Sequence, residues 1–252
     1  MDLDIRIVCE IARQAGEAIM DIYSGNFNVE LKGDDSPLTC ADKASHEVIV
    51  AGLKKHFPEI PILSEEGKDI PFEVRKDWKS FWLVDPLDGT KEFIKRNGEF
   101  TVNIAFIEQG EPVAGVVFVP AQDNLYWANK EQGAWYQTGK EEPLSIQVRK
   151  VNHSRGLTVV MSRSHPSQAL ADFLKNINVA KALPVGSSLK FCVVAEGLAD
   201  LYPRLGPTME WDTAAGHALV VAAGGSVESQ DGGILTYNKE NLLNSNFIVR
   251  GS

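Results

Sequence analysis

A buried strand that ends in closely spaced carboxylates is the feature that most constrains how this chain can fold. The apolar run Phe81–Val84 predicts a strand that ends on Asp85. A turn is expected at Pro86, and a second carboxylate follows at Asp88. Two carboxylates in such a turn can converge on one hard cation. The next residues, Gly89–Thr90, offer backbone N–H groups where a helix should begin, which suits a phosphate. The segment suggests metal-assisted hydrolysis of a phosphate ester, with an ordinary Asp-Gly turn as the alternative.

Composition limits the classes of protein to which the chain can belong. Its 252 residues allow one large domain or two fused lobes, and 44% hydrophobic with 23% charged residues are globular values. The net charge of −9 argues against a nucleic-acid polymer as partner, because phosphate backbones need a basic surface. A small phosphorylated ligand can still bind where divalent cations reverse the local sign of the charge.

Cysteine usage and the N-terminus indicate the compartment. Cys9, Cys40 and Cys192 show no C-x-x-C spacing, so they predict buried thiols in a reducing cytosol rather than a disulfide frame or a zinc site. The first residues lack the basic start and apolar core of a signal peptide, and no apolar run reaches the roughly 18–20 residues of a membrane span. We therefore expect a soluble cytoplasmic protein without a transmembrane segment.

Hydrophobic periodicity divides the chain into two parts. Residues 1–150 predict a lobe in which two helices cover an antiparallel sheet, with helices at 3–23 and 41–57 and strands at 60–63, 81–84, 101–107, 113–119, 125–128 and 133–136. A loop is expected at 32–37. Residues 151–252 alternate strands at 157–161, 181–185, 199–202, 226–228 and 247–249 with helices at 166–176, 187–196 and 213–223. The cleft between the two parts is the natural place for a ligand.

The paired carboxylates need further oxygen ligands, because a divalent cation in such a site takes about six. The candidates are the backbone carbonyl of Leu87, the glutamates Glu65 and Glu66 at the end of another strand, and Asp212 before a helix of small residues. The alternative for the glutamates is a solvated turn, and for Asp212 it is a helix N-cap.

Hydrolysis also requires an activated water. A carboxylate hydrogen-bonded to a threonine hydroxyl could orient and deprotonate a metal-bound water, and Asp42 and Thr90 are the candidates. Another N-cap is the alternative for Asp42. The sequence has no histidine pair with zinc-hydrolase spacing, no P-loop and no G-x-S-x-G elbow, although Gly186–Lys190 before a helix could bind an anion.

These segments together resemble the inositol monophosphatase-like superfamily of metal-dependent, lithium-sensitive phosphatases. Its two signatures are matched by Trp82–Thr90 and by Trp211–His217, and the resemblance spans nearly the whole chain. Within the superfamily, Lys91–Asn103, Gly186–Cys192 and Leu201–Arg204 look like the branch of 3′(2′),5′-bisphosphate nucleotidases, of the bacterial type linked to sulfate assimilation.

The resemblance implies a fold and an activity. The fold would be a layered α/β/α/β/α sandwich, an α/β architecture of the inositol monophosphatase and fructose bisphosphatase type. The activity would be magnesium-dependent hydrolysis of adenosine 3′,5′-bisphosphate to AMP and phosphate, with action on its sulfated relative left open. The partner would be a small phosphorylated nucleotide. Monomer or homodimer, and loose attachment to the cytoplasmic face of the inner membrane, also stay open.

The resemblance also gives each candidate residue a role. Glu65, Asp85 and the Leu87 carbonyl would bind one magnesium, and Asp85, Asp88 and Asp212 a second. Asp42 and Thr90 would position the attacking water, and Glu66 would assist with a third, weaker metal. The residues that would contact the substrate are Glu65, Leu87, Asp88, Gly89, Thr90, His165, Ser187, Lys190, Arg204 and Asp212.

Two alternative functions stay open. An inositol or sugar monophosphatase would have little use for both Lys190 and Arg204, which favour a substrate with a second phosphate. These two cations could instead form surface or interdomain salt bridges. A non-catalytic sensor of phosphorylated ligands would lack a metal carboxylate or Thr90, and none is missing here.

Overall fold

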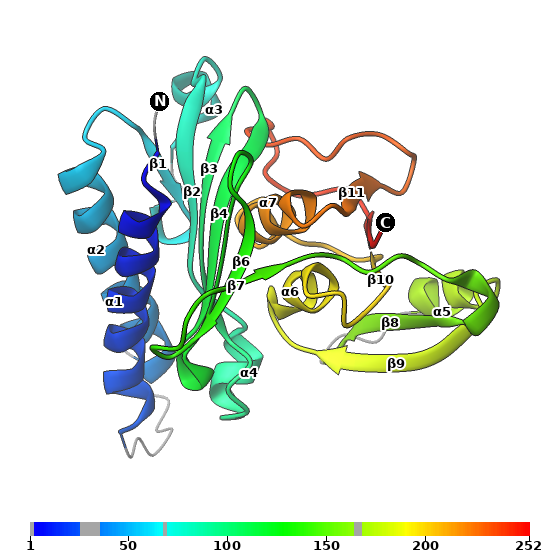
Figure 1. Ribbon diagram of the computed structural model, residues 1–252. Helices are drawn as coiled ribbons and strands as arrows, with labels where there is room; N and C mark the ends of the chain where they lie inside the picture. The colour runs from blue at the N-terminus through cyan, green and yellow to red at the C-terminus, as the bar shows by residue number, and fades with distance from the viewer. Residues whose placement is uncertain (1–2, 26–35, 68–69, 164–167) are drawn as a thin grey trace.

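The computed structural model describes residues 3–25, 36–67, 70–163 and 168–252. Helices and sheets alternate in layers: α1 and α2, a first sheet, α6 and α7, a second sheet, and α5 on the far side (Figure 1). The predicted layered sandwich is thus confirmed. The predicted loop at 32–37 lies mostly outside the described residues, as does His165.

The first sheet has seven strands in the described part of the chain, arranged in sequence order. They are β1 (Ile62–Ser64), β2 (Ser80–Asp88), β3 (Thr101–Glu108), β4 (Glu111–Val119), β5 (Asn124–Asn129), β6 (Gly133–Thr138) and β7 (Leu144–Ile146). All neighbours are antiparallel except β1 and β2, which are parallel. The expectation of a purely antiparallel sheet was wrong at this edge, because the chain between them is long enough for a crossover that includes α3 (Phe72–Arg75).

The second sheet has the strand order β11-β12-β10-β8-β9 in the described residues. Its strands are β8 (Leu157–Ser162), β9 (Val179–Val185), β10 (Leu201–Arg204), β11 (Ser226–Ser229) and β12 (Phe247–Arg250). Strand β8 is parallel to both β9 and β10, whereas β12 is antiparallel to its neighbours β10 and β11. The predicted alternation of strand and helix in this half of the chain is confirmed.

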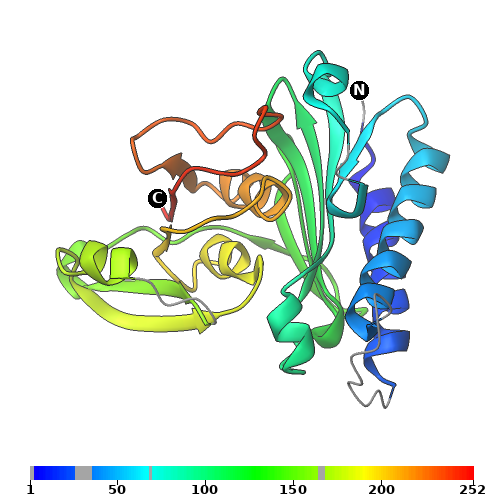
Figure 2. The same ribbon diagram turned by 180° about the vertical axis from the view of Figure 1, so that it is seen from behind.

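The outer helices α1 (Ile5–Tyr23) and α2 (Pro37–His56) lie side by side on one face of the first sheet (Figure 2). Helix α2 begins earlier than predicted, because the Ser36 side chain accepts a hydrogen bond from the Thr39 N–H and a proline occupies the first helical position. Asp42 is therefore inside the helix, and the N-cap interpretation of this residue was wrong.

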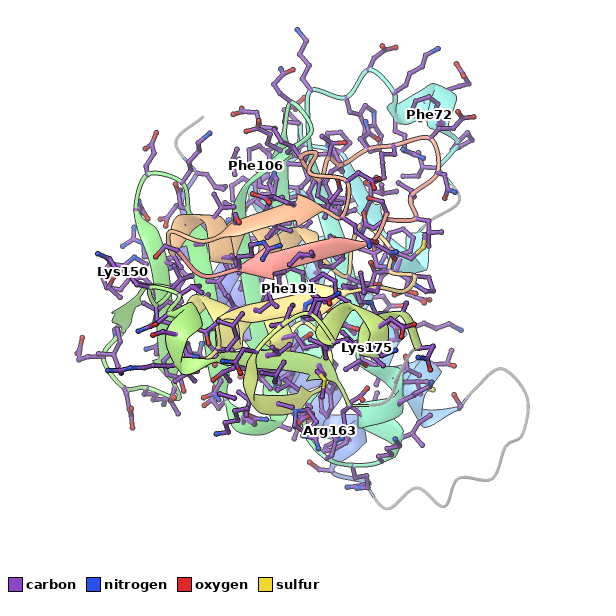
Figure 3. All side chains as sticks on the ribbon, turned by 90° about the vertical axis from the view of Figure 1, so that its right-hand side faces the viewer. Phe72, Phe106, Lys150, Arg163, Lys175 and Phe191 are labelled. Atoms are coloured by element: carbon purple, nitrogen blue, oxygen red, sulfur yellow. The ribbon has the colours of Figure 1, made fainter. Side chains whose placement is uncertain are left out.

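The middle helices α6 (Leu189–Ala195) and α7 (Ala214–Ala222) belong to the core between the two sheets. Phe191 of α6 stacks on Phe247 of β12 with ring centroids 5.9 Å apart, and it lies near the centre of the molecule in Figure 3. Helix α7 approaches β4 closely at Gly115, where a Cβ would lie 2.6 Å from the Ala215 carbonyl oxygen. A glycine is required there for the middle layer to reach the first sheet.

The remaining elements are short. They are α4 (Thr90–Ile94), α5 (Gln168–Leu174) and the 3₁₀ turns η1 (Glu65–Gly67), η2 (Pro120–Gln122) and η3 (His153–Arg155). Cys9 and Cys192 are buried as predicted, but Cys40 is exposed, because it is on a different side of α2 from the fully buried Ala41. Among the described helices, none has the length and apolarity needed to cross a membrane.

Candidate active site

Strand β2 does not end at Asp85, as the sequence suggested. It continues to Asp88, and the pairing with β3 shifts between these two residues: Asp85 pairs with Asn103 and Asp88 with Thr101. The two pairs are three residues apart on β2 but only two residues apart on β3. The extra residue makes a β-bulge, and the strand does not turn at Pro86. The bulge leaves Asp85 buried, with its Oδ1 accepting the Leu87 N–H at 3.1 Å.

Other carboxylates converge on Asp85. Burial raises its pKa well above the ordinary value, and the nearby charges of Asp88, Glu65, Asp212 and Asp42 raise it further. Glu65 reaches this position because β1 runs parallel to β2, with Ser64 in register with Val84. Glu66 is exposed, as a solvated turn would predict, whereas Glu65 is half-buried.

Asp88 connects the two halves of the chain. Its Oδ2 lies 2.6 Å from Ser187 Oγ and 2.9 Å from Ser188 Oγ. Ser187 has a left-handed backbone, with φ of 51°, and its hydroxyl is also 2.6 Å from Thr101 Oγ1. This conformation is costly for a residue with a side chain, and such strain clusters at functional sites.

Asp212 is held by the loop before α7. Its Oδ2 accepts the Met209 N–H at 2.8 Å, and α7 begins after Thr213 without a side-chain cap. The N-cap interpretation of Asp212 was therefore wrong. Burial and the charge of Asp88 raise the pKa of Asp212 to about 7, against the lowering effect of the Met209 hydrogen bond.

The sequence placed Asp42 and Thr90 together as a water-activating pair. Thr90 is exposed at the start of α4, after Gly89 with φ of 95°, and Asp42 is half-buried on α2. No hydrogen bond joins the two among the described contacts. Asp42 lies near the carboxylate cluster, because its charge raises the pKa of Asp85.

A cavity of about 360 Å³ opens between the two halves of the chain. It brings together seven of the predicted residues: Asp88, Gly89, Thr90, Ser187, Lys190, Arg204 and Asp212. Glu65, Asp85 and Leu87 are not part of its lining, and Asp85 and Leu87 are buried behind it. The expected cleft between the two parts is therefore present.

Lys190 and Arg204 line this cavity, together with Lys91. Lys190 is 6% exposed, its Nζ donates to the Ser187 carbonyl at 2.5 Å, and burial lowers its pKa to about 8 although nearby carboxylates favour its charge. Arg204 Nη2 donates to the Pro207 carbonyl at 2.7 Å, and its buried Nε has no hydrogen-bond partner. Neither Lys190 nor Arg204 forms a salt bridge with a described residue, so the salt-bridge interpretation was wrong. Burying a cation that is not directly paired is costly, and an anionic ligand would offset part of that cost.

The carboxylate cluster fits a hard cation by the chemistry of its donors, which are oxygens only. The described side chains do not already surround one point with three or more acidic, histidine or cysteine donors. Oxygens of Asp88 and Asp212 are instead held by hydroxyl and amide donors. Asn103, in register with Asp85, has a buried Oδ1 without a hydrogen-bond partner.

Sequence reasoning missed several polar residues of the site. Ser188, Thr101 and Asn103 are buried, and Asn103 Nδ2 donates to Ser188 Oγ at 3.0 Å. A signal existed, since two polar residues at alternate positions interrupt the otherwise apolar start of β3. Tyr202, whose ring centroid lies 5.6 Å from Lys190 Nζ, gave no comparable signal.

Known proteins resemble this chain along nearly its whole length. Residues 2–250 match the Inositol monophosphatase family. The 3′(2′),5′-bisphosphate nucleotidase CysQ of Salmonella typhimurium is 53% identical over 245 residues, covering 96% of this chain and 97% of that protein. CysQ of Escherichia coli K12 is 51% identical over 246 residues, with the same coverage. The crystal structure of CysQ from Bacteroides thetaiotaomicron superposes with a TM-score of 0.89 at 43% identity, covering 99% of this chain and 98% of that chain.

Proposed function

The chain belongs to the inositol monophosphatase family, and from that premise we propose that it is a 3′(2′),5′-bisphosphate nucleotidase. It hydrolyses adenosine 3′,5′-bisphosphate to AMP and phosphate. The observation that carries this proposal is the pair of cations without salt bridges, Lys190 and Arg204, in the same cavity as Asp88 and Asp212. A cavity that contains both these cations and the carboxylates proposed to hold metal suits a ligand with two phosphates, one cleaved and one held.

The metal-binding part of the proposal follows the family resemblance. Magnesium would be held by Glu65, Asp85 and the Leu87 carbonyl at one position, and by Asp85, Asp88 and Asp212 at a second. Glu66 would assist a third. When bound, the ions would lower the pKa of the attacking water and neutralise charge on the phosphoryl group.

The protein's own groups would orient the substrate. Gly89 and Thr90 N–H groups would hold the phosphate that is cleaved, while Lys190 and Arg204 would bind the phosphate that is kept. Asp42 and the Thr90 hydroxyl would position the attacking water. Ser187 would fix Asp88 through its short hydrogen bond. His165 stays a prediction for the nucleotide.

The remaining parts of the proposal rest on the resemblance alone. They are action on the sulfated relative of the bisphosphate, sensitivity to lithium, a role in sulfate assimilation and a cytoplasmic location. The nearest alternative is an inositol or sugar monophosphatase with the same fold. The first experiment is phosphate release from adenosine 3′,5′-bisphosphate, inositol 1-phosphate and fructose 1,6-bisphosphate in the presence of Mg²⁺.

Two variants test the assignment of the second phosphate. Lys190→Ala and Arg204→Ala should each lower kcat/KM for adenosine 3′,5′-bisphosphate. The loss of transition-state stabilisation should be about 1.5–3 kcal/mol, the range for hydrogen bonds to charged groups. Both should leave hydrolysis of inositol 1-phosphate nearly unchanged, because this substrate has no second phosphate. The matched control is Lys181→Ala, which removes an exposed lysine of β9. Equal losses on both substrates would favour the inositol phosphatase.

A further inference from the structure

A second cavity, of about 370 Å³, lies apart from the catalytic one. It is enclosed by α7, by the start of β4 with Lys130 after β5, and by β11 with the segment that follows it. The two cavities share no lining residue. Much of this wall is apolar, with Ala218, Val227 and Leu235 buried and Val221 and Ile234 exposed at the rim. Its volume is within the range of small-molecule sites.

One buried polar side chain lines this apolar cavity. His217 is 5% exposed, and its Nδ1 lies 2.9 Å from the hydroxyl of Tyr237, which is not part of the cavity wall. The Nε2 atom has no hydrogen-bond partner among the described residues. Because Nδ1 is directed at Tyr237, the opposite edge of the ring, with Nε2, is left for the cavity.

The hydrogen bonds around Tyr237 determine which nitrogen of His217 carries the proton. The Thr213 hydroxyl donates to the Glu210 carbonyl at 3.0 Å, so it can only accept from Tyr237. The Tyr237 hydroxyl is 3.3 Å from Thr213 Oγ1 but 2.9 Å from His217 Nδ1. Both contacts of Tyr237 can be hydrogen bonds only if its single proton is donated to Thr213 and its oxygen accepts from His217 Nδ1–H. The proton of the ring is therefore on Nδ1, and Nε2 is an acceptor.

The cavity carries little charge. Burial lowers the pKa of His217 to about 4, so the ring is neutral at pH 7. The charged groups among the lining residues are Glu111 and Lys130, which face each other at 3.8 Å and are mostly exposed. A charged ligand would therefore lose its hydration without gaining a counter-ion.

We propose that this cavity is a second ligand site, which binds a small, uncharged, mainly apolar molecule with one hydrogen-bond donor. The apolar part of the molecule contacts Ala218, Val227 and Leu235, and the donor forms a hydrogen bond to His217 Nε2. A ligand with an acceptor alone would leave its polar group and Nε2 without a partner, which is costly in a largely apolar site. The proposal does not rest on the proposed nucleotidase activity, since the two cavities share no lining residue.

Phenol is a suitable probe, because it combines an apolar ring with a single hydroxyl that can donate. The full chain is labelled with ¹⁵N-histidine and titrated with phenol, and His217 is assigned by the loss of its signals in His217→Gln. We expect a saturable shift of the His217 Nε2 resonance. Toluene, which lacks the donor, should bind at least tenfold more weakly and should leave Nε2 without the shift typical of a hydrogen bond.

Two rim variants make the test specific. Val221→Trp fills the mouth of the cavity, and Ile234→Asp adds a charge there; both positions are exposed, so both proteins should fold. Each should abolish the shift, whereas Leu198→Trp, at an exposed position outside the cavity lining, should keep it. The proposal is overturned if the wild-type shift does not saturate, if both rim variants keep it, or if toluene binds as tightly as phenol.

Discussion

Lys190 shows how burial changes the pKa of a charged residue in the catalytic cavity. Its side chain is almost fully buried, donates a hydrogen bond to the Ser187 carbonyl and forms no salt bridge with a described residue. Burial therefore lowers its pKa from 10.5 to about 8, although nearby carboxylates oppose this shift. The residue is charged at neutral pH at a cost to stability, and a bound anion would reduce that cost.

The first prediction concerns this titration. As pH rises through about 8, Lys190 loses its charge, so kcat/KM for adenosine 3′,5′-bisphosphate should fall. Lys190→Arg, which stays charged, should not show this decline. The free energy of unfolding should change in the opposite direction and increase as pH rises. The stabilising contribution of neutral Lys190 is fully present above the unfolded pKa of 10.5 and is lost as pH falls through about 8. Identical pH profiles of wild type and Lys190→Arg would contradict the assignment.

His217 gives a second prediction. Its pKa is lowered from 6.5 to about 4, so its contribution to stability is present above pH 6.5 and is lost as pH falls through about 4. The full effect is roughly 3 kcal/mol. As pH falls from 6.5 to about 4, the free energy of unfolding measured in urea should decrease less for His217→Gln than for wild type. His56→Gln, at an exposed position of α2, should behave like wild type. Equal slopes for all three proteins would show that His217 is not buried as a neutral ring.

The third prediction concerns Asp85. Because burial and neighbouring carboxylates both disfavour its charge, Asp85→Asn should raise the unfolding temperature of the protein in EDTA. The same change should nearly abolish phosphate release in Mg²⁺, since the proposed bridging ligand is lost. Calorimetry and a phosphate assay test the two effects on the same sample. A variant that is less stable in EDTA, or one with wild-type turnover, would count against this role of Asp85.

At the scale of secondary-structure elements, the site depends on how α7 is placed against the first sheet. The helix carries Thr213 at its start and lies over β4, where Gly115 leaves room for its backbone. The loop before it holds Asp212 through Met209. A change in the distance between α7 and β4 would therefore be transmitted to a carboxylate of the catalytic cavity.

The fourth prediction follows from that close contact. Gly115→Ala would place a Cβ 2.6 Å from the Ala215 carbonyl oxygen, so backbone has to move. We expect a loss of about 1–3 kcal/mol in the free energy of unfolding, as for overpacked cores. Gly206→Ala is the control, because nothing lies within 4 Å of its Cβ. Urea unfolding of both variants tests this, and an equal effect of the two would show that α7 tolerates displacement.

At the scale of the whole molecule, the two sheets are joined by a shared core rather than by a linker. One cluster of buried residues includes Phe81 of β2, Phe191 of α6 and Phe247 of β12. The hydrogen bonds from Ser187 and Ser188 to Asp88 cross the same boundary. The division into residues 1–150 and 151–252 that we proposed from the sequence would then describe lobes of one folding unit.

The fifth prediction is that unfolding is a single cooperative transition. Trp82 is in the first lobe and Trp211 in the second, and both are buried. Two variants, each keeping one of the five tryptophans, either Trp82 or Trp211, should give coincident urea transitions by fluorescence. Both transitions should also coincide with the one followed by circular dichroism. Separate midpoints for the two reporters would mean that the lobes unfold independently.

Local patterns in the sequence predicted most elements but not the contacts between them. Helix α1 was predicted well because its apolar stripe is continuous and buried. The bulge in β2 was missed, since Asp-Pro-Leu-Asp-Gly has the composition of a turn and only pairing with β3 shows that the strand continues. Strand β7 was missed because it is short and exposed at the sheet edge. The contact of Ser187 with Asp88 joins residues 99 positions apart, which no local pattern encodes.

The left-handed backbone of Ser187 determines which replacements selection would favour at this position. Glycine would relieve the strain at this position, so a search for heat-resistant variants alone should recover Ser187→Gly. The same replacement would remove the hydroxyl that holds Asp88. Robustness and turnover therefore compete at one position, and only selection for turnover gives a reason to keep the serine.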